Sequence, residues 1–322
     1  MKITVIVCTF NRYRSLLKAL ESVAAQVLPE SIEWEVIVVD NNSSDRTREV
    51  TEQYCRRYPG RFRYVAEPQQ GKSHALNRGI REAEGEVLAF MDDDVTVESA
   101  WLYNVTAPLQ RSTWAGVGGR IVPPLDFSPP SWLAMEGPYD LSGILALFDK
   151  GRVGVELTEA PFGTNMAFRK QIFEKYGLFR PDLGPRPGSE IRGEDTEFGR
   201  RVLKGGDRLW YEPSAIVHHA VPESRLQKQY FLRFLYDQGR ASIREKGRRP
   251  TIWFLLSIVL RPLRTRMIGW LFAFDSQRRF QQKCLVWMTF GQIIEILESN
   301  SRSKIRGDKL PPAMISSKQN RA

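Results

Sequence analysis

The first hundred residues alternate short apolar runs with amphipathic stretches, and this alternation restricts the fold more than any other feature of the chain. Short apolar runs rich in Val and Ile predict strands, whereas apolar residues spaced three and four apart predict helices. The predicted strands are 3–7, 34–39, 62–65 and 87–91, and the predicted helices are 13–26, 45–57 and 73–82. Strands that alternate with helices form a sheet with right-handed crossovers, so we expect an α/β fold.

Polar residues gather where three of these strands end. They are Thr9, Asn11 and Arg12 after the first strand, Asp40 with residues 41–43 after the second, and Asp92, Asp93 and Asp94 after the last. The carboxyl ends of parallel strands meet at one edge of such a sheet, and ligands bind there. Helix caps also stand at strand ends, and they would explain one polar residue at each junction but not three consecutive carboxylates.

Three adjacent carboxylates at the end of a buried strand are unfavourable on their own. Like charges repel, and burial removes the solvation that each carboxylate needs. A hard divalent cation would relieve both effects, because carboxylate oxygens are its preferred ligands. A solvated acidic turn is the alternative interpretation.

The charge of the chain is divided unevenly between its two parts. Residues 1–224 hold 27 Lys and Arg against 31 Asp and Glu, whereas residues 225–322 hold 20 against 6. The basic character therefore belongs to the C-terminal part, and it favours nucleic acid or an anionic membrane surface as a partner.

Cysteine is scarce, and the N-terminus shows no targeting pattern. Cys8, Cys55 and Cys284 form no C-x-x-C pair, which argues against a disulfide framework or a zinc site and suits a reducing compartment. The first residues enter a strand-like run at once and lack the features of a signal peptide. We expect a cytoplasmic protein, peripheral at the inner face of the cell membrane.

Several stretches resemble the inverting family 2 glycosyltransferases, which have the GT-A fold. The stretches are VIVCTFNR (5–12), WEVIVVDNNSSDRT (34–47), GKSHALNRGI (71–80), GEVLAFMDDDV (85–95), PFGTNMAFRKQIFEKYGLF (161–179), GEDTEFGRRV (193–202) and AIVHHAVPESRL (215–226). Their order implies a catalytic domain over 1–225, with a nucleotide-sugar half at 1–119 and an acceptor half at 120–225. The fold implied is a Rossmann-like mixed sheet flanked by helices. Residues 120–160 are rich in Pro and aromatic residues, which predicts a mobile segment over the site or an ordinary linker.

The resemblance implies a donor site at the strand ends. In the family's Asp-x-Asp element, the first aspartate contacts the nucleotide and the last holds Mg²⁺ or Mn²⁺, which assigns Asp92 to the nucleotide and Asp94 to the metal. Asp93 either adds charge behind the metal or faces solvent. The other substrate contacts expected from the matched stretches are Thr9, Asn11, Arg12, Asp40, Lys72 and Asn77, with Asp40 reading the nucleobase. Lys72 and Arg78 fit a phosphate contact or, almost equally, a solvated face.

The resemblance also implies an acceptor site. Asp195 matches the family's catalytic base, although Glu194 and Asp195 would also favour a helix N-terminus electrostatically. Gly163, Thr164 and Asn165 match the segment that lines the donor sugar and the acceptor, and Glu194 joins them as a substrate contact. His218 matches the histidine that completes the metal shell, with His219 in reserve. A histidine engaged only in packing is the alternative.

The C-terminal part changes character from about residue 226. Its apolar runs 251–260, 267–274 and 284–294 are interrupted by arginines and are shorter than a spanning helix requires. We expect residues 226–298 to form basic amphipathic helices that bind an anionic membrane surface or, alternatively, pack on the protein. Residues 299–322 are polar and are predicted to be disordered.

Together these patterns predict a metal-dependent inverting glycosyltransferase with a GT-A catalytic domain and a basic helical extension. The donor would be a UDP- or GDP-sugar, and the acceptor a hydroxyl of a saccharide or glycolipid in polysaccharide biosynthesis. A polyprenyl-phosphate glycosyltransferase is the second possibility. A basic nucleic-acid-binding protein is a third, but it leaves the Asp92–Asp94 and Glu194–Asp195 motifs unexplained, and no nucleic-acid motif is visible.

Overall fold

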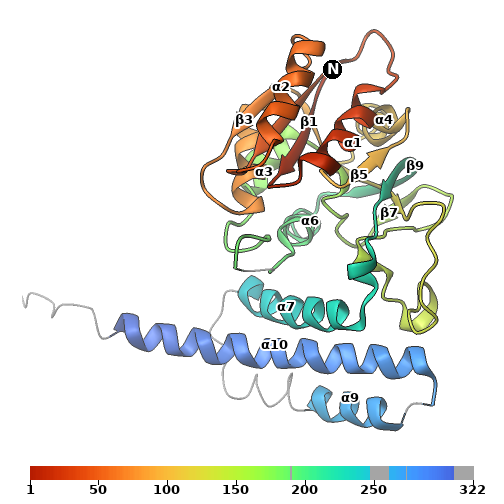
Figure 1. Ribbon diagram of the computed structural model, residues 1–322, viewed down its shortest axis with the longest axis vertical. Helices are drawn as coiled ribbons and strands as arrows, with labels where there is room; N and C mark the ends of the chain where they lie inside the picture. Colours follow the sequence, from red (N-terminus) through yellow and green to blue (C-terminus); the bar gives the residue numbers. More distant parts are fainter. Residues whose placement is uncertain (189–190, 247–260, 273, 308–322) are drawn as a thin grey trace, which may run out of the picture.

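The computed structural model describes residues 1–188, 191–246, 261–272 and 274–307, so the apolar run 251–260 lies outside the described residues. Figure 1 shows a part built on a sheet, with the C-terminal helices of the described residues stacked beside it. The strands are β1 (Lys2–Thr9), β2 (Glu33–Asp40), β3 (Phe62–Ala66), β4 (Val87–Asp92), β5 (Val95–Val97), β6 (Gly116–Val122), β7 (Val155–Leu157), β8 (Asn165–Arg169) and β9 (Leu209–His219). The α-helices are α1 (Tyr13–Ala24), α2 (Thr47–Arg57), α3 (Lys72–Glu82), α4 (Trp101–Arg111), α5 (Lys170–Tyr176), α6 (Glu194–Lys204), α7 (Lys228–Lys246), α9 (Arg261–Phe272) and α10 (Ser276–Gly307).

The strands form one mixed sheet, which confirms the expected fold class. Its order is β3-β2-β1-β4-β8-β6-β9-β5, and β7 pairs with β9. The half made of β3, β2, β1 and β4 is parallel, whereas β8 lies antiparallel to both β4 and β6. The carboxyl ends of β1, β2 and β4 therefore lie side by side, and the polar residues that follow them share one edge.

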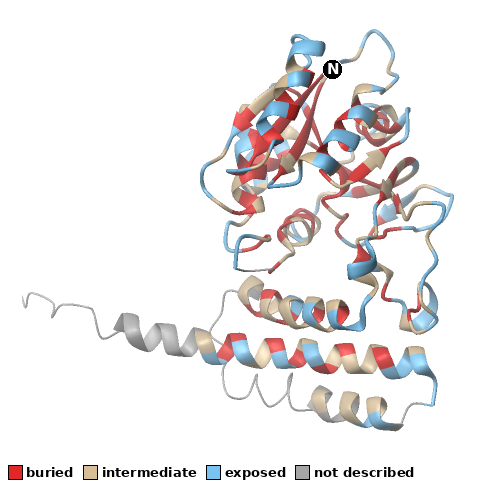
Figure 2. Ribbon diagram, in the orientation of Figure 1, coloured by how far each residue is buried: buried red, intermediate tan, exposed pale blue. Residues whose placement is uncertain are grey.

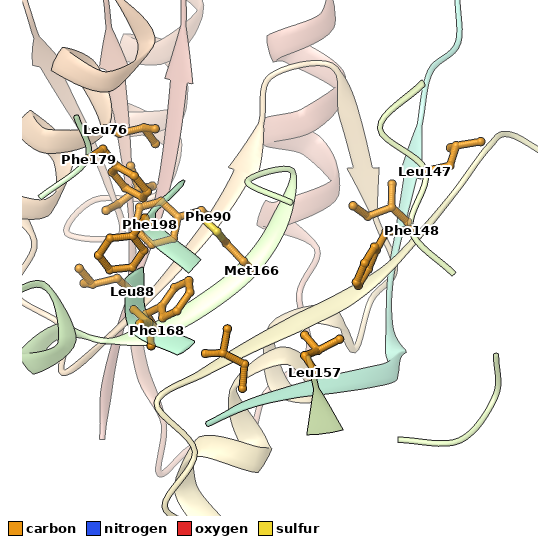
Figure 3. Close-up of a cluster of buried hydrophobic side chains, with 14 of the residues drawn as sticks. Leu76, Leu88, Phe90, Leu147, Phe148, Leu157, Met166, Phe168, Phe179 and Phe198 are labelled. Atoms are coloured by element: carbon orange, nitrogen blue, oxygen red, sulfur yellow. The ribbon is translucent and has the colours of Figure 1, made fainter. Parts of the chain in front are cut away.

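A cluster of aromatic side chains holds α5 and α6 against the sheet. Phe90 of β4 and Phe168 of β8 pack against Phe173, Phe179 and Phe198, and the rings of Phe173 and Phe198 are stacked with centroids 4.5 Å apart (Figure 3). All five side chains are buried. This packing fixes α6, which carries Glu194 and Asp195 at its first two positions, relative to the strand that ends in the aspartates.

The segment 120–160 is packed into the protein along much of its length. After β6 it forms two short 3₁₀ turns, Gly137–Tyr139 and Ser142–Leu145, before β7 begins. Leu133, Leu141 and Leu145 are buried in the same core as the sheet. The expectation of a mobile segment therefore finds no support over these residues.

The C-terminal helices α7, α10 and α9 lie side by side, as Figure 1 shows. The α7 and α10 backbones come into direct contact at two glycines: a Cβ on Gly291 would stand 1.9 Å from the Tyr236 carbonyl oxygen, and one on Gly239 would stand 2.0 Å from that of Met288. Arg240 and Arg244 of α7 pair with the buried Glu295 of α10. Figure 2 shows buried residues along both helices.

Two further findings concern this part of the chain. Within the described residues, none of the helices is both long enough and apolar enough to cross a bilayer. The helix α10 continues past Ser299, where a disordered tail is predicted, and ends at Gly307. Polar residues such as Arg and Lys are good helix formers, so a polar composition does not by itself end a helix.

The glycine contact between α7 and α10 gives a test of this packing. In a free helix, Gly291→Ala would stabilise the chain, because Ala is the better helix former by about 1 kcal/mol. We expect the opposite here: a lower free energy of unfolding in urea, by roughly 1–3 kcal/mol, because the methyl group has no space. Gly143→Ala is the control, since its Cβ would meet only the Phe162 ring at 3.7 Å. A stabilised Gly291→Ala protein would contradict the contact.

Candidate active site

A cavity of about 300 Å³ opens at the carboxyl ends of β1 and β4. Thr9 is the last residue of β1, and Arg12 lies in the segment that follows it. Asp92 is the last residue of β4, and Asp93 and Asp94 follow it directly. The other lining residues come from separate segments: Cys8, Phe10, Asn41, Gln70, Lys72, Ala75, Ala146, Pro185, Arg186, Pro187, Arg192, His219 and Arg225. The predicted convergence of strand ends on one site is thus found for the ends of β1, β2 and β4.

Each aspartate of the trio has a different set of partners. Asp92 accepts a hydrogen bond from Lys72 at 2.6 Å and another from the Thr164 hydroxyl at 2.8 Å. Asp93 is buried, 3.3 Å from the Arg12 guanidinium. Asp94 lies between Arg12 at 3.0 Å and Arg225 at 3.2 Å. Cations from three distant segments therefore offset the repulsion that the sequence analysis pointed out.

These partners shift the pKa values of the trio in opposite directions. Burial raises the pKa of Asp93 to about 6. The positive charge of Arg12 lowers this pKa, and the negative charge of Asp94 raises it. Burial acts the same way on Asp94, but its interaction with His219 and the charges of the two arginines hold the pKa of Asp94 below its usual range. The ammonium of Lys72 likewise lowers the pKa of Asp92 against the effect of burial. Asp92 and Asp94 therefore stay ionised at neutral pH.

The two adjacent histidines face different surroundings. The Nε2 atom of His218 lies 3.3 Å from Glu98, on the partly exposed side of β9. His219 is buried, and its Nε2 lies 3.5 Å from the Asp94 carboxylate. Successive side chains on a strand point to opposite faces, so only one of the pair can reach the site. The reserve choice, His219, therefore stands beside Asp94, whereas the first choice, His218, lines neither cavity.

A second cavity, of about 600 Å³, adjoins the first and contains Asp195. The carboxylate of Asp195 accepts a hydrogen bond from the Gly163 N–H at 2.6 Å and one from the Thr196 N–H at 2.6 Å. Side chains of α7 and α10 form the opposite wall of this cavity, namely Phe234, Leu235, Gln238, Ala241, Ser242, Glu245, Met288 and Gln292. The C-terminal helices thus contribute to the site, which the sequence analysis did not foresee.

Lys72 and Asp92 line both cavities and so join them. The Lys72 ammonium lies 2.6 Å from Asp92 and 3.8 Å from the buried carboxylate of Glu194. These charges raise the pKa of Lys72 although burial opposes it. Burial, followed by the charge of Asp195, raises the pKa of Glu194 to about 7. Lys72 is therefore a partly buried cation held by two acidic groups, whereas Arg78 pairs with Glu82 outside the cavities.

Four of the predicted substrate contacts line neither cavity, and their side chains bond to the protein itself. Asn77 uses both ends of its amide on the backbone of Phe179. Asn165 accepts from the Trp101 indole and donates to two backbone carbonyls. The Asp40 carboxylate accepts from Tyr64 and from the Ser43 N–H. Asn11 accepts from the Ser44 N–H, which ties the loop after β1 to the loop after β2. Buried polar side chains need such partners, and a sequence motif does not reveal which partner each one finds.

Several residues that line the first cavity were not predicted from the sequence. Arg225 follows β9 and contacts both Asp94 and His219. Asn41 lines the cavity where Asp40 was expected, and its amide is bonded to the backbone of Glu67, Gln69 and Gly71. The sequence shows Arg225 a few positions beyond the last strand, but it does not show how far Arg225 lies from the aspartates.

The residues near Asp94 fit a divalent cation that a bound substrate would help to hold. The Nδ1 of His219 lies 2.9 Å from the Leu145 carbonyl oxygen, which can only accept, so Nδ1 carries the proton in the neutral ring. The Nε2 atom then accepts a hydrogen bond from the Arg225 guanidinium at 3.1 Å and lies 3.5 Å from the Asp94 carboxylate. Fixing a ring through its other nitrogen in this way is typical of metal-binding histidines. Among the described residues, no three His, Cys, Asp or Glu side chains converge to hold a metal alone. Further ligands would have to be substrate oxygens or water.

Comparison with known proteins relates this chain to one family. The family model described as Glycosyl transferase family 2 matches residues 4–177. The succinoglycan biosynthesis protein ExoM of Rhizobium meliloti is 28% identical, covering 73% of this chain and 72% of that protein. A glucosyl-dolichyl phosphate glucuronosyltransferase of Haloferax volcanii is 26% identical, covering 74% of this chain and 75% of that protein.

A solved structure shares the fold. It is the mannosyltransferase PcManGT from Pyrobaculum calidifontis, solved in complex with GDP-Man and Mn²⁺. The TM-score is 0.56 at 19% identity, and the alignment covers 96% of this chain and 76% of that chain. At this identity the likeness concerns the fold alone.

The raised pKa of Glu194 predicts how stability depends on pH. A buried carboxyl whose pKa is raised to about 7 favours folding while it is protonated, and this contribution is lost as the pH rises from about 4.5 through 7. Glu194→Gln removes this loss, so we expect the variant to gain stability over wild type across that range, reaching roughly 1–3 kcal/mol. Urea unfolding at several pH values measures the difference. A difference that does not change with pH would contradict the shifted pKa.

Proposed function

The chain belongs to glycosyl transferase family 2, and from this membership we propose that it transfers a sugar from a nucleotide diphosphate sugar to a hydroxyl of a saccharide or glycolipid, with inversion at the anomeric carbon. It is a glycosyltransferase with the GT-A fold, and its relatives act in polysaccharide and glycolipid biosynthesis. One observation carries the proposal: a cavity with the three aspartates and a cavity with Asp195 meet at Asp92 and Lys72.

The first cavity suits the donor. A nucleotide diphosphate gains negative charge as it leaves, and fixed positive groups lower the energy of that state. Arg12, Lys72 and Arg225 line the cavity close to the aspartates, so each can pair with phosphate oxygens. We assign Asp92 to the donor. Its two carboxylate oxygens are held by Lys72 and Thr164, at the place where the two cavities meet.

Asp94 and His219 are the residues that would hold Mg²⁺ or Mn²⁺. A bound divalent cation supplies positive charge to the diphosphate as the bond to the sugar breaks. His219 replaces His218 in this role because its Nε2 lies 3.5 Å from Asp94. The Arg225 guanidinium donates to this Nε2 atom, so a bound cation would take the place of Arg225 there. The proposal draws support from the Mn²⁺ in PcManGT.

Asp195 is the proposed catalytic base. As the acceptor hydroxyl oxygen forms a bond to the anomeric carbon, its proton moves to the Asp195 carboxylate and the bond to the diphosphate breaks. The N–H groups of Gly163 and Thr196 hold the carboxylate in place. Gly163 permits this approach, because a Cβ there would stand 3.1 Å from the Asp195 Oδ2 atom.

The second cavity suits an acceptor with both polar and apolar surfaces. Gln238, Ser242 and Gln292 offer hydrogen-bonding groups, and Phe162, Phe234 and Met288 offer apolar contact. Sugars present hydroxyls on their edges and C–H groups on their faces, so a saccharide matches this lining. A polyprenyl phosphate is the second candidate acceptor. It is favoured by Arg192 and Arg200 in the lining and by the dolichyl-phosphate relative.

Replacement of Asp195 tests the base. We expect Asp195→Asn to slow release of nucleoside diphosphate by roughly 100- to 10,000-fold, because the amide cannot accept the proton. The assay uses Mn²⁺ with a panel of UDP-, GDP- and dTDP-sugars and saccharide acceptors. Glu197→Gln on the same helix is the matched control, because Glu197 pairs with Arg201 and lines neither cavity. Full activity of Asp195→Asn would remove Asp195 from this role.

The adjacent histidines test the metal site. We expect His219→Ala to raise the Mn²⁺ concentration for half-maximal activity by about 10- to 100-fold, since a ligand is lost. Mn²⁺ binding in the presence of UDP or GDP, followed by electron paramagnetic resonance, measures the same loss without turnover. His218→Ala is the control and should change neither value. The reverse pattern would return the role to His218.

A further inference from the structure

Four large apolar side chains are exposed along one face of α10. They are Trp287, Phe290, Ile294 and Leu297, with exposed fractions of 41%, 44%, 37% and 55%, and we call them the α10 stripe. Their spacing of three and four residues places them on a single helix face. Water-soluble surfaces rarely expose a continuous set of this size unless it binds something.

The other faces of α10 are occupied. Gly291 touches the α7 backbone, and Glu295 is buried beneath two α7 arginines. On a further side, Thr289 accepts a hydrogen bond from Arg266 of α9. The α10 stripe is therefore held in a fixed orientation outside the packed core of the helices.

Basic residues extend the α10 stripe toward the start of the helix. Lys283 and Arg279 lie four and eight residues before Trp287, and this spacing places them on the same face. Arg279 is exposed, and the Lys283 ammonium lies 5.7 Å from the ring centroid of Trp270. Residues 225–322 as a whole carry 20 Lys and Arg against 6 Asp and Glu. The occupant of this face must therefore match an apolar row next to positive charge.

We propose that the α10 stripe lies in the interface of an anionic membrane, with Arg279 and Lys283 at the lipid head groups. Aromatic and aliphatic side chains next to basic ones are typical of helices that lie in this plane. A second copy of the chain, paired as a coiled coil, fits less well. Among the positions flanking the stripe, Val286, Gly291 and Ile293 carry no charge, and Glu298 is paired with Arg240 of α7.

This attachment sets where the second cavity stands. Met288 and Gln292 of α10 line that cavity, while Trp287 and Phe290 belong to the α10 stripe. Neighbouring positions of one helix thus serve the cavity and the membrane. Met288 and Gln292 lie on the face of α10 away from the α10 stripe, so the cavity would stand about one helix diameter, roughly 10 Å, from the bilayer surface, within reach of the polar end of a lipid-linked acceptor. The membrane proposal itself does not depend on the proposed reaction, since it rests on exposure and charge.

Vesicle binding of the full chain tests the proposal. Sucrose-loaded vesicles of phosphatidylcholine, with and without phosphatidylglycerol, are sedimented with wild type and with Trp287→Ser/Phe290→Ser. We expect wild type to sediment with the anionic vesicles, and the double variant to bind at least about tenfold more weakly, because two large apolar groups are lost. Leu125→Ser/Val153→Ser is the matched control, since both side chains are exposed outside the helices and should leave binding unchanged.

Replacement of Arg279 and Lys283 tests the part that positive charge plays in membrane binding. Arg279→Gln/Lys283→Gln should weaken binding to phosphatidylglycerol vesicles about tenfold and reduce its sensitivity to salt. Arg56→Gln/Arg57→Gln removes the same charge from α2 and should have little effect. Circular dichroism of each variant checks that it is folded. Failure of wild type to bind, or equal binding of the folded stripe variant, overturns the proposal. Light scattering gives a further outcome that overturns it. If wild type is a dimer and only the stripe variant is a monomer, the α10 stripe binds a second copy of the chain.

Discussion

Neutralisation of the carboxylates at the end of β4 is the interaction on which the site depends. Asp92, Asp93 and Asp94 cannot remain ionised and partly buried together without cations within a few ångströms. Arg12, Lys72 and Arg225 meet that need from the end of β1, the start of α3 and the segment after β9. Parts of the chain more than a hundred residues apart are therefore tied to the same three side chains.

The same compensation explains how one region can accept a highly charged substrate. Before a ligand binds, the arginines and the lysine are occupied with protein carboxylates. A diphosphate would bring its own charges, and a divalent cation with it would take over the partnership with Asp94. In the proposed reaction, donor binding would thus exchange one balanced set of charges for another and leave no uncompensated charge in a low dielectric.

The sequence was enough to predict the alternating elements, the convergence of strand ends and the placement of Asp195 in a cavity, because each follows from periodicity or from a recognised motif. It was not enough to choose between His218 and His219. That choice depends on the register of β9, in which His219 pairs with Val95 and His218 with Thr96. The contacts of Asn77 and Asn165 could not be predicted for a similar reason. A buried amide bonded to the backbone and an amide that binds a ligand look the same in a sequence. The contribution of α7 and α10 to the second cavity could not be read from composition, because it depends on how distant helices pack.

The glycine contact between α7 and α10 has a mechanical consequence. Two helices that meet through long side chains can slide by changing rotamers, but Gly239 and Gly291 bring backbone against backbone and leave no soft layer between them. A tilt of α10 would then tilt α7 with it. Because both helices form a wall of the cavity that holds Asp195, a tilt of the pair as one unit would change the width of that cavity.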